Sequence, residues 1–240
     1  MTNSLDAGVL VELHNLSKVY GTNGQRTAGV HDIQLSGSAG EMIVLLGPSG
    51  SGKTTLLTLI AGFVGPSAGT VRLFGSDITR YSPAQLQRLR ARNIGFVFQT
   101  FRLLDALSAL DNVSLSPRFA GASHKAARDK AARLLSQLGI SHLQHDFPNR
   151  LSQGERQRVA IARAFATDAS LILADEPTAS LETQQGLEVI TLLKEYARTR
   201  PACVIVASHD LRMASSADRI VRLQDGKLMH QVVPWVPRNP

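Results

Sequence analysis

The stretch that most constrains the fold of this chain runs from Gly47 to Thr54 and reads G-P-S-G-S-G-K-T. In a phosphate-binding loop of this pattern, glycines allow successive backbone N–H groups to turn toward the phosphates of a nucleotide. The lysine adds a charge that reaches the same phosphates, and the next hydroxyl can ligate Mg²⁺. The pattern predicts that these residues bind a nucleoside triphosphate: Gly47, Pro48, Ser49, Gly50, Ser51, Gly52, Lys53, Thr54 and Thr55.

The residues on either side of the loop test whether the match is a chance Gly/Ser-rich turn. Residues 41–46 form an apolar run typical of a buried strand, and residues 53–61 favour a helix that ends at Gly62. A phosphate-binding loop needs this order, because the helix points its positive N-terminus at the phosphates. The context therefore favours a functional phosphate loop.

A second apolar run, residues 170–174, ends in the adjacent carboxylates Asp175 and Glu176. Charged residues at the end of a buried strand lie at the rim of an α/β sheet, where ligands bind. Beside a phosphate loop, Asp175 is expected to join Thr54 around Mg²⁺, and Glu176 is expected to orient or deprotonate the attacking water. The alternative is an acidic loop without a catalytic role.

The composition favours an anionic partner. The chain has 240 residues and a formal net charge of +7, which suits nucleic acid, an acidic lipid surface or nucleotide. With one tryptophan and three tyrosines, a stacking platform is poorly supported and no nucleic acid partner is expected. The arginines along two helical segments are expected to lie mostly on solvated faces: Arg88, Arg90, Arg92, Arg156, Arg158 and Arg163.

The cysteine count and the apolar runs indicate the cellular compartment of the chain and its relation to a membrane. The single cysteine, Cys203, excludes a disulfide within the chain, suits a reducing compartment and, within the apolar run 202–207, is expected to fill the core. The first ten residues lack the features of a signal peptide, and the apolar runs are far shorter than the about 20 residues that cross a bilayer. The chain is therefore expected to be soluble or to reach a membrane through a partner.

Strand-like segments recur along the chain and alternate with helical patterns in its later part. Strands are expected near residues 9–13, 30–35, 41–46, 70–74, 94–98, 171–175, 203–207 and 219–223. Helices are expected after a capping box at Ser82, from about 124 to 138, and from 156 to about 166. This order predicts an α/β fold with a phosphate-loop (RecA-like) core, an N-terminal antiparallel β subdomain and an α-helical insert at about 100–160. The Pro-rich tail, 234–240, is expected to be irregular.

Residues 151–155, L-S-Q-G-E, precede the last of these helices. Ser152 and Glu155 alone make a capping box, which needs no function. The segment becomes informative because it belongs to a set of motifs in a fixed order along the chain. That order is the phosphate loop, Gln99, residues 151–155, the two carboxylates after residue 174, and His209. That set resembles the nucleotide-binding subunits of ABC transporters over about residues 10–230. The resemblance implies a single nucleotide-binding domain over residues 8–233, with the helical insert inside it.

The resemblance also implies roles that local patterns leave unassigned. Tyr20 matches the aromatic residue that stacks on adenine, although a lone tyrosine would otherwise read as packing. Gln99 matches the glutamine that touches Mg²⁺ and senses the membrane partner. His209 matches the histidine that contacts the γ-phosphate, although a lone histidine after a strand is more often structural. The implied ligands are ATP and Mg²⁺, and the implied catalytic residues are Glu176, His209 and Gln99.

Ser152 and Gly154 match the signature segment that faces the phosphate loop of a second subunit. The resemblance thus implies a homodimer that encloses two ATP molecules, each completed by a helix N-terminus of the other subunit. Gln153 stands where the family usually has glycine, at a variable position. Glu182 stands where the family has aspartate, and its extra methylene is expected to weaken communication between the two ATP sites.

Three segments, residues 154–164, 173–178 and 217–227, resemble one subgroup: the ATPases of lipoprotein-releasing systems, macrolide exporters and the cell-division ABC pair. In that subgroup the ATPase drives a separate integral membrane permease, for export or mechanical work. The resemblance implies a cytoplasmic chain, peripheral on the cytoplasmic face of the cell (inner) membrane, which touches the membrane through its partner. Residues 101–104, F-R-L-L, are the expected receptor for a helix of the permease, and a buried amphipathic turn is the alternative.

Other classes of function stay open. A soluble ABC protein of DNA repair or translation would usually carry a second module, a coiled-coil insertion or a zinc module, and the sequence contains none of these. A regulatory ATPase that acts on cell-wall enzymes through a membrane partner would have a similar ATPase half. An importer subunit is disfavoured only by the subgroup resemblance. A phosphate-loop kinase is not expected, because no acceptor-binding lid is evident and the signature segment would lack a purpose.

Overall fold

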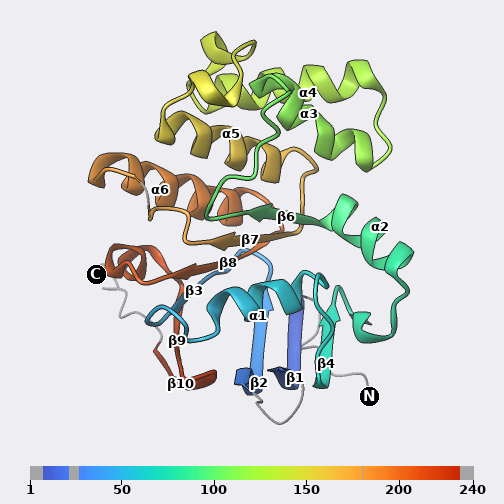
Figure 1. The fold of residues 1–240 in the computed structure, drawn as a ribbon, viewed down its shortest axis with the longest axis vertical. Coiled ribbons are helices and arrows are strands. Elements are labelled where there is room, and N and C mark those ends of the chain that lie inside the picture. The colour runs from blue at the N-terminus through green and yellow to red at the C-terminus, as the bar shows by residue number, and fades with distance from the viewer. Residues whose placement is uncertain (1–7, 22–26, 180, 233–240) are drawn as a thin grey trace, which may run out of the picture.

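The computed structural model describes residues 8–21, 27–179 and 181–232. Its larger sheet has the strand order β10-β9-β3-β8-β7-β6 and runs through the middle of the molecule (Figure 1). Strands β9, β3, β8, β7 and β6 are parallel, and β10 joins β9 antiparallel at the edge. Parallel strands place their carboxyl ends at one edge of the sheet, where ligands bind in α/β folds. The strands are β3 (Met42–Leu46), β6 (Ile94–Val97), β7 (Leu171–Asp175), β8 (Cys203–Ser208), β9 (Arg219–Gln224) and β10 (Lys227–Val232).

Both faces of this sheet are buried, because alternate residues along a strand point to opposite sides. In β3, Met42 and Val44 pack into the core on the helical side, whereas Ile43 and Leu45 pack into the core on the other side. Strands β7 and β8 divide their residues in the same way. Burial on both faces explains why these strands are unbroken apolar runs in the sequence, and their predicted positions are confirmed.

A smaller antiparallel sheet covers one side of the phosphate loop, with the strand order β2-β1-β4-β5. Its strands are β1 (Val9–Tyr20), β2 (Thr27–Ser38), β4 (Ala68–Leu73) and β5 (Ser76–Asp77). Leu13, Ile33 and Val71 of this sheet share a core with Leu56 and Ile60 of the helix after the phosphate loop. The predicted N-terminal antiparallel β subdomain is confirmed, with β1 and β2 longer than their apolar patterns indicated.

The helices lie mainly on the other side of the larger sheet. They are α1 (Lys53–Ile60), α2 (Pro83–Asn93), α3 (Ala109–Phe119), α4 (His124–Gln137), α5 (Gln153–Phe165) and α6 (Thr183–Thr199). Figure 1 shows α3, α4 and α5 as a separate layer, contributed by the chain between β6 and β7. This layer is the predicted α-helical insert. Short 3₁₀ turns at 78–80, 141–143, 148–150 and 211–216 connect these elements.

Helix starts follow their capping residues. The capping box between Ser82 and Gln85 is present at the start of α2, as predicted. The box between Ser152 and Glu155 is also present, and it starts α5 at Gln153, three residues earlier than the sequence pattern indicated. The difference arises because Ser152 is itself the N-cap, so that the signature segment forms the first turn of α5.

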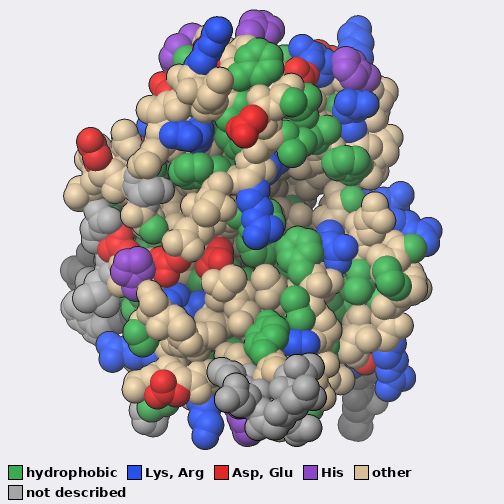
Figure 2. All heavy atoms as spheres, in the orientation of Figure 1, with side chains coloured by type: hydrophobic (Ala, Val, Ile, Leu, Met, Phe, Trp, Pro, Cys, Tyr) green, Lys and Arg blue, Asp and Glu red, His purple; other side chains and the backbone are tan. Residues whose placement is uncertain are grey.

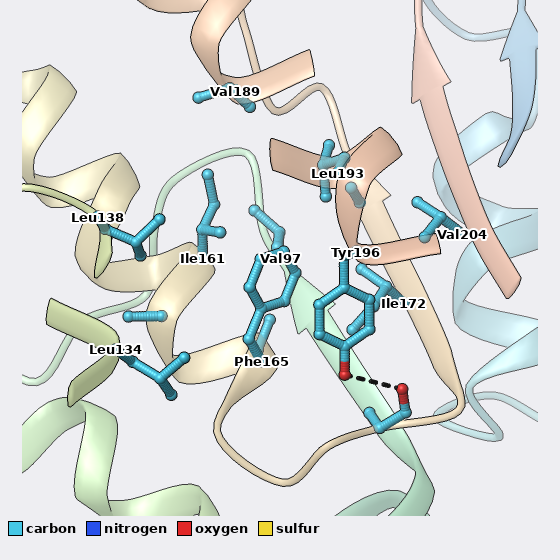
Figure 3. Packing of buried hydrophobic residues seen from close by; sticks show 14 of the residues in the cluster. Val97, Leu134, Leu138, Ile161, Phe165, Ile172, Val189, Leu193, Tyr196 and Val204 are labelled. Carbon is cyan, nitrogen blue, oxygen red and sulfur yellow. Dashed lines mark hydrogen bonds between the residues drawn. The ribbon is translucent and has the colours of Figure 1, made fainter. Parts of the chain in front are cut away.

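Aromatic packing joins the helical layer to the larger sheet (Figure 3). The rings of Phe165 in α5 and Tyr196 in α6 stack with centroids 4.1 Å apart. The Tyr196 hydroxyl donates a hydrogen bond to the carbonyl of Ala169 at 2.9 Å, and burial raises its pKa. Cys203 fills the core on the opposite face, and burial likewise raises the pKa of its thiol. The stacked rings thus tie α5 to α6 within the core that also buries Ile172 of β7 and Val204 of β8.

None of the helices within residues 8–21, 27–179 and 181–232 is both long and apolar enough to cross a membrane. The Pro-rich tail, 234–240, and Ser180 of the segment 179–182 lie outside the described residues.

Candidate active site

The phosphate loop follows β3 and depends on glycine at particular points. Gly50 and Gly52 have φ angles of 79° and 103°, in the left-handed region that favours glycine. A Cβ atom on Gly52 would lie 2.2 Å from the carbonyl oxygen of Gly29, and one on Gly47 would lie 2.1 Å from that of Leu223. The neighbouring strands therefore hold the loop so closely that only glycine fits at these two positions.

Lys53 begins α1 and turns its side chain back over the loop. Its ammonium group donates hydrogen bonds to the carbonyl oxygens of Gly47 at 2.7 Å and Pro48 at 3.0 Å. The same nitrogen lies 3.5 Å from a carboxylate oxygen of Glu176. The side chain of Lys53 is only 6% exposed, so its charge is held inside the loop. When a nucleotide binds, the ammonium group can donate hydrogen bonds to phosphate oxygens instead of to these two carbonyls.

The polar groups of the loop suit a triphosphate. Gly52 is the N-cap of α1 without a side-chain cap, and the first turn of α1 has no acidic residue, so its N–H groups are open to an anion. The buried hydroxyl of Ser51 has no hydrogen-bond partner among the described residues. A phosphate oxygen would satisfy these groups, which is why the loop fits a nucleotide.

Thr54 and Asp175 come together from the two predicted motifs. The Thr54 hydroxyl donates to the two carboxylate oxygens of Asp175 at 2.9 and 3.1 Å. Burial raises the pKa of Asp175, the nearby charge of Glu176 adds to the rise, and the hydrogen bond from Thr54 opposes it. Hydroxyl and carboxylate oxygens are ligands that Mg²⁺ accepts together with phosphates and water. The pair is therefore chemically suited to hold Mg²⁺ beside the phosphates.

Glu176 follows β7 in an unusual backbone conformation. Its φ angle is 47°, in the left-handed region that residues other than Gly, Asn and Asp rarely adopt. Its N–H donates to the carbonyl of Ala207 in β8 at 2.9 Å. One carboxylate oxygen lies 2.9 Å from Nδ1 of His209, and the other faces Lys53. The structure thus brings the sequence-predicted residues Lys53, Glu176 and His209 into one cluster at the carboxyl edge of the sheet.

Tyr20 and Gln99 lie at the borders of this cluster. The Tyr20 ring is 42% exposed and lies against Gly29, since a Cβ there would be 2.7 Å from the ring and 3.0 Å from Thr55. Gln99 is exposed, two residues after the end of β6, beside β7 at the same edge of the sheet. Within the described part of the chain, Gln99 makes no hydrogen bond to Thr54, Asp175 or Glu176.

Ser152 and Gly154 lie in the helical layer, at the start of α5. Ser152 is exposed, accepts from the N–H of Glu155 at 3.4 Å and donates to its carboxylate at 2.8 Å. The hydrogen bonds from Ser152 lower the pKa of Glu155. The side chain of Gln185 in α6 lies over Gly154, where a Cβ would be 2.7 Å from its amide. For the residues that the structure describes, no hydrogen bond or ion pair joins this segment to the phosphate loop of the same chain.

The expectation that the arginines of α5 are mostly solvated is wrong. Arg158 bonds the carbonyl of Leu138 and pairs with Glu188 of α6, and Arg156 lies over the ring of Phe101 at 5.7 Å. Arg163 donates to two carbonyls of the loop after Gln99. Arg156 and Arg163 are seven residues apart and therefore share the helix face that meets the loop after Gln99.

The structure buries part of the segment 101–104 that the sequence predicted as the receptor for a permease helix. Phe101 lies under Arg156, and Leu103 packs against the core of the helical side. Leu104 is 51% exposed, and its backbone is held by the buried side chain of Asn112. Within this segment, Leu104 is the apolar side chain that is presented to solvent.

Comparison with known proteins agrees with this arrangement. The family model described as ABC transporter matches residues 30–179. The chain is 40% identical over 221 residues to the macrolide export ATP-binding/permease protein MacB of Salmonella choleraesuis, which covers 92% of this chain and 34% of MacB. It therefore spans about a third of MacB. It is 39% identical to HrtA of Staphylococcus haemolyticus, an ATP-binding protein whose name assigns it to hemin import, over 91% of this chain and 98% of HrtA.

A solved structure shows the same fold. The ATP-binding cassette MJ0796, in a dimeric post-hydrolysis state with ADP and Pi, superposes with a TM-score of 0.88 at 34% identity, covering 93% of this chain and 98% of that chain. The phosphate loop, the pair of carboxylates at the end of β7 and the helical insert thus belong to a chain whose family match spans more than half its length. The chain belongs to the ABC transporter family and is one of its ATP-binding, ATP-hydrolysing cassettes.

Proposed function

We propose that this ATPase works as a homodimer that drives a separate integral membrane permease, for export or mechanical work across the membrane. The cluster in which Glu176 faces Lys53 on one side and His209 on the other, beside the Thr54–Asp175 pair, supports the ATP hydrolysis that would power this work. That cluster has an acceptor for a proton, a charge for phosphate and oxygen ligands for Mg²⁺.

Each residue then has a chemical role. Lys53 and the N–H groups of the loop bind the phosphates, and Tyr20 stacks on the adenine. Thr54, Asp175 and Gln99 would hold Mg²⁺, which would neutralise charge on the phosphate oxygens. The oxygen of a water forms a bond to the γ-phosphorus while the bond to the oxygen that leaves with ADP breaks. Glu176 orients that water and accepts its proton.

His209 keeps Glu176 in place for this step. Its Nδ1 lies 2.9 Å from a carboxylate oxygen of Glu176, and its backbone N–H donates to the same oxygen at 3.4 Å. These contacts come from the loop after β8, so they fix the carboxylate against a rigid strand end. His209 is 60% exposed, which leaves it accessible to the γ-phosphate from the solvent side.

The homodimer completes the site with Ser152 and Gly154 of the second subunit. Both lie at the N-terminus of α5, where backbone N–H groups can face an anion. Within one chain this segment has no bond to the phosphate loop among the described residues, which is what a site completed by a partner requires. The relative MJ0796 was solved as a dimer with ADP and Pi. ATP would stabilise this dimer, and hydrolysis would release it.

A groove between the core and the helical layer is the proposed receptor for the permease. It has a volume of about 550 Å³ and lies between α2, β6, α3 and α5. Phe63, Phe96, Phe98 and Phe119 give it apolar walls, and Figure 2 shows hydrophobic and basic side chains gathered beside a hollow there. Phe119 is 73% exposed. Such an exposed apolar patch is typical of an interaction site.

The charges in the groove indicate the chemistry of the partner. Arg88, Arg90 and Arg163 line it, and no Asp or Glu does so in the part of the chain that is described. Burial lowers the pKa of Arg90, whose guanidinium contacts the Gly62 carbonyl and lies over the ring of Phe63. The groove therefore suits a short segment with a large apolar side chain and a nearby carboxylate. Through that contact the ATPase would lie on the cytoplasmic face of the cell (inner) membrane.

The names of the relatives describe transport in both directions. MacB is named for macrolide export and HrtA for hemin import. We propose the export or mechanical branch for this chain because of the subgroup segments in its sequence. A regulatory ATPase with a membrane partner would use the same ATP site and the same groove.

Capture from detergent-solubilised native membranes tests the partner. Tagged chain carrying Glu176→Gln, with ATP and Mg²⁺, is expected to retain a permease that mass spectrometry identifies. Adding Phe119→Glu should remove the permease, because it places a charge on the apolar wall of the groove. Met229→Glu is the matched control, since Met229 is also an exposed apolar residue, in β10. Recovery of nucleic-acid proteins without any membrane protein would contradict the proposal.

A further inference from the structure

The loop that follows Gln99 is held by one residue of the signature helix. Arg163, near the C-terminal end of α5, donates from Nη1 to the carbonyl of Arg102 at 2.5 Å. Its Nη2 donates to the carbonyl of Phe101 at 2.6 Å. The planar guanidinium thus spans two consecutive carbonyls, which a lysine ammonium cannot do with the same geometry.

These two carbonyls belong to a strained turn. Phe101 and Arg102 have φ angles of 59° and 48°, so two consecutive non-glycine residues are left-handed. The turn is closed by a hydrogen bond from the N–H of Phe101 to the carbonyl of Phe98 at 3.1 Å, and by one from Arg102 to Thr100 at 2.6 Å. Such a conformation persists only where its surroundings hold it, and the bonds from Arg163 do so.

The environment of Arg163 makes these bonds strong. Burial lowers its pKa to about 10, so the guanidinium stays charged at neutral pH. No carboxylate pairs with it among the residues placed by the structure, and its charge is directed at the two carbonyls. Hydrogen bonds from a charged donor are stronger than those between neutral groups.

Arg163 also faces the groove proposed for the permease. It lines that groove together with Phe98, and the guanidinium of Arg102 lies 4.3 Å from the centre of the Phe98 ring. A segment that enters the groove would therefore contact Arg163 and the wall that supports the turn. The helix that carries Arg163 is capped at its start by Ser152, the signature residue.

We propose that Arg163 is a positioning residue that fixes the turn at residues 100–102 and thereby sets the position of Gln99 relative to Thr54 and Asp175. The proposal rests on the role proposed above for Gln99 at Mg²⁺. Because Arg163 is bound to the turn, contacts made in the groove and motion of α5 both change the position of Gln99. The signature helix and the Mg²⁺ site are in this way mechanically joined within one chain.

Hydrogen–deuterium exchange of the purified full chain tests the contact without any turnover. The comparison is between the wild type, Arg163→Lys, Arg163→Gln and the control Arg158→Gln. Arg158 is on the same helix and bonds Leu138 and Glu188 instead of the turn. In both Arg163 variants, amides 100–104 should exchange about tenfold faster or more, while amides of the phosphate loop stay unchanged. Equal exchange at 100–104 in all four proteins would overturn the proposal.

Mg²⁺ activation of ATP hydrolysis tests the consequence. In Arg163→Lys, the Mg²⁺ concentration for half-maximal activity should rise by about tenfold, whereas binding of a fluorescent ADP analogue in EDTA should stay as in the wild type. Arg158→Gln should keep the wild-type Mg²⁺ profile. If the wild type shows no Mg²⁺-dependent hydrolysis, the proposed function fails. If it does and Arg163→Lys has the same Mg²⁺ profile, only the role of Arg163 fails.

Discussion

The hydroxyl of Thr54 lies 2.9 Å from a carboxylate oxygen of Asp175, although 121 residues separate the two positions. Thr54 belongs to the first turn of α1, and Asp175 ends β7. They meet because β3 and β7 both pair with β8 in parallel, which brings the phosphate loop and the end of β7 to one edge of the sheet. The phosphate loop and the end of β7 thus form one site, and substitutions in either motif test it.

Replacing Asp175 by Asn should remove the response to Mg²⁺. The amide keeps the shape and can accept from Thr54, but it lacks the charge that a divalent cation needs. We expect Mg²⁺-dependent ATP hydrolysis to fall by about a hundredfold or more, with ATP binding in EDTA retained. Steady-state ATPase assays over a range of Mg²⁺ concentrations measure this. Asp129→Asn, at an exposed position on α4, is the control, and an Asp175→Asn enzyme with the Mg²⁺ response of that control would contradict the assignment.

The same substitution should stabilise the fold at neutral pH without nucleotide or Mg²⁺. Burial raises the pKa of Asp175 above its ordinary value of 3.8, so the folded protein binds this proton more tightly than the unfolded chain. The ionised carboxylate therefore lowers stability above the raised pKa, and this loss vanishes as the pH falls below the unfolded value. Asp175→Asn should melt at a higher temperature than the wild type at neutral pH, with a difference that shrinks toward about pH 4 in thermal scans. A less stable variant at neutral pH would show that this reading of the site is wrong.

The glycines of the phosphate loop should differ in their tolerance of alanine. At Gly52 a Cβ would lie 2.2 Å from the Gly29 carbonyl, and at Gly50 it would meet nothing within 4 Å. Both have positive φ angles, so both variants carry the strain of a left-handed alanine, of order 1 kcal/mol. Gly52→Ala should lose about 2 kcal/mol more than Gly50→Ala, because the backbone must also move. Urea unfolding of the two variants measures the difference, and equal losses would contradict the packing described.

Much of the fold could be predicted from local patterns. The unbroken apolar runs of β3, β7 and β8 follow from a parallel sheet buried on both faces, and the capping box at Ser82 marked the start of α2. The phosphate loop was evident because its glycines, lysine and threonine are adjacent in sequence. The edge strand β10 and the full length of β1 and β2 were not evident, because half-exposed strands lack a continuous apolar run.

Contacts between distant segments could not be predicted in the same way. The left-handed backbone of Glu176 and the contact between Glu176 and His209 depend on how β7 pairs with β8. The bonds from Arg163 to the turn after Gln99 join positions about 60 residues apart, and an arginine in a helix is usually solvated. These tertiary relationships have no signature in a short window of sequence.

In the proposed homodimer, ATP joins two copies of this chain through the phosphate loop and the signature segment. Its most direct test is the molar mass of purified Glu176→Gln by size-exclusion chromatography with light scattering. With ATP and Mg²⁺ we expect a dimer, and with ADP a monomer. Adding Ser152→Arg should restore the monomer while each chain still binds ATP. A Glu176→Gln protein that binds ATP yet stays monomeric at every concentration, or a dimer unaffected by Ser152→Arg, would show that ATP does not join the subunits in this way.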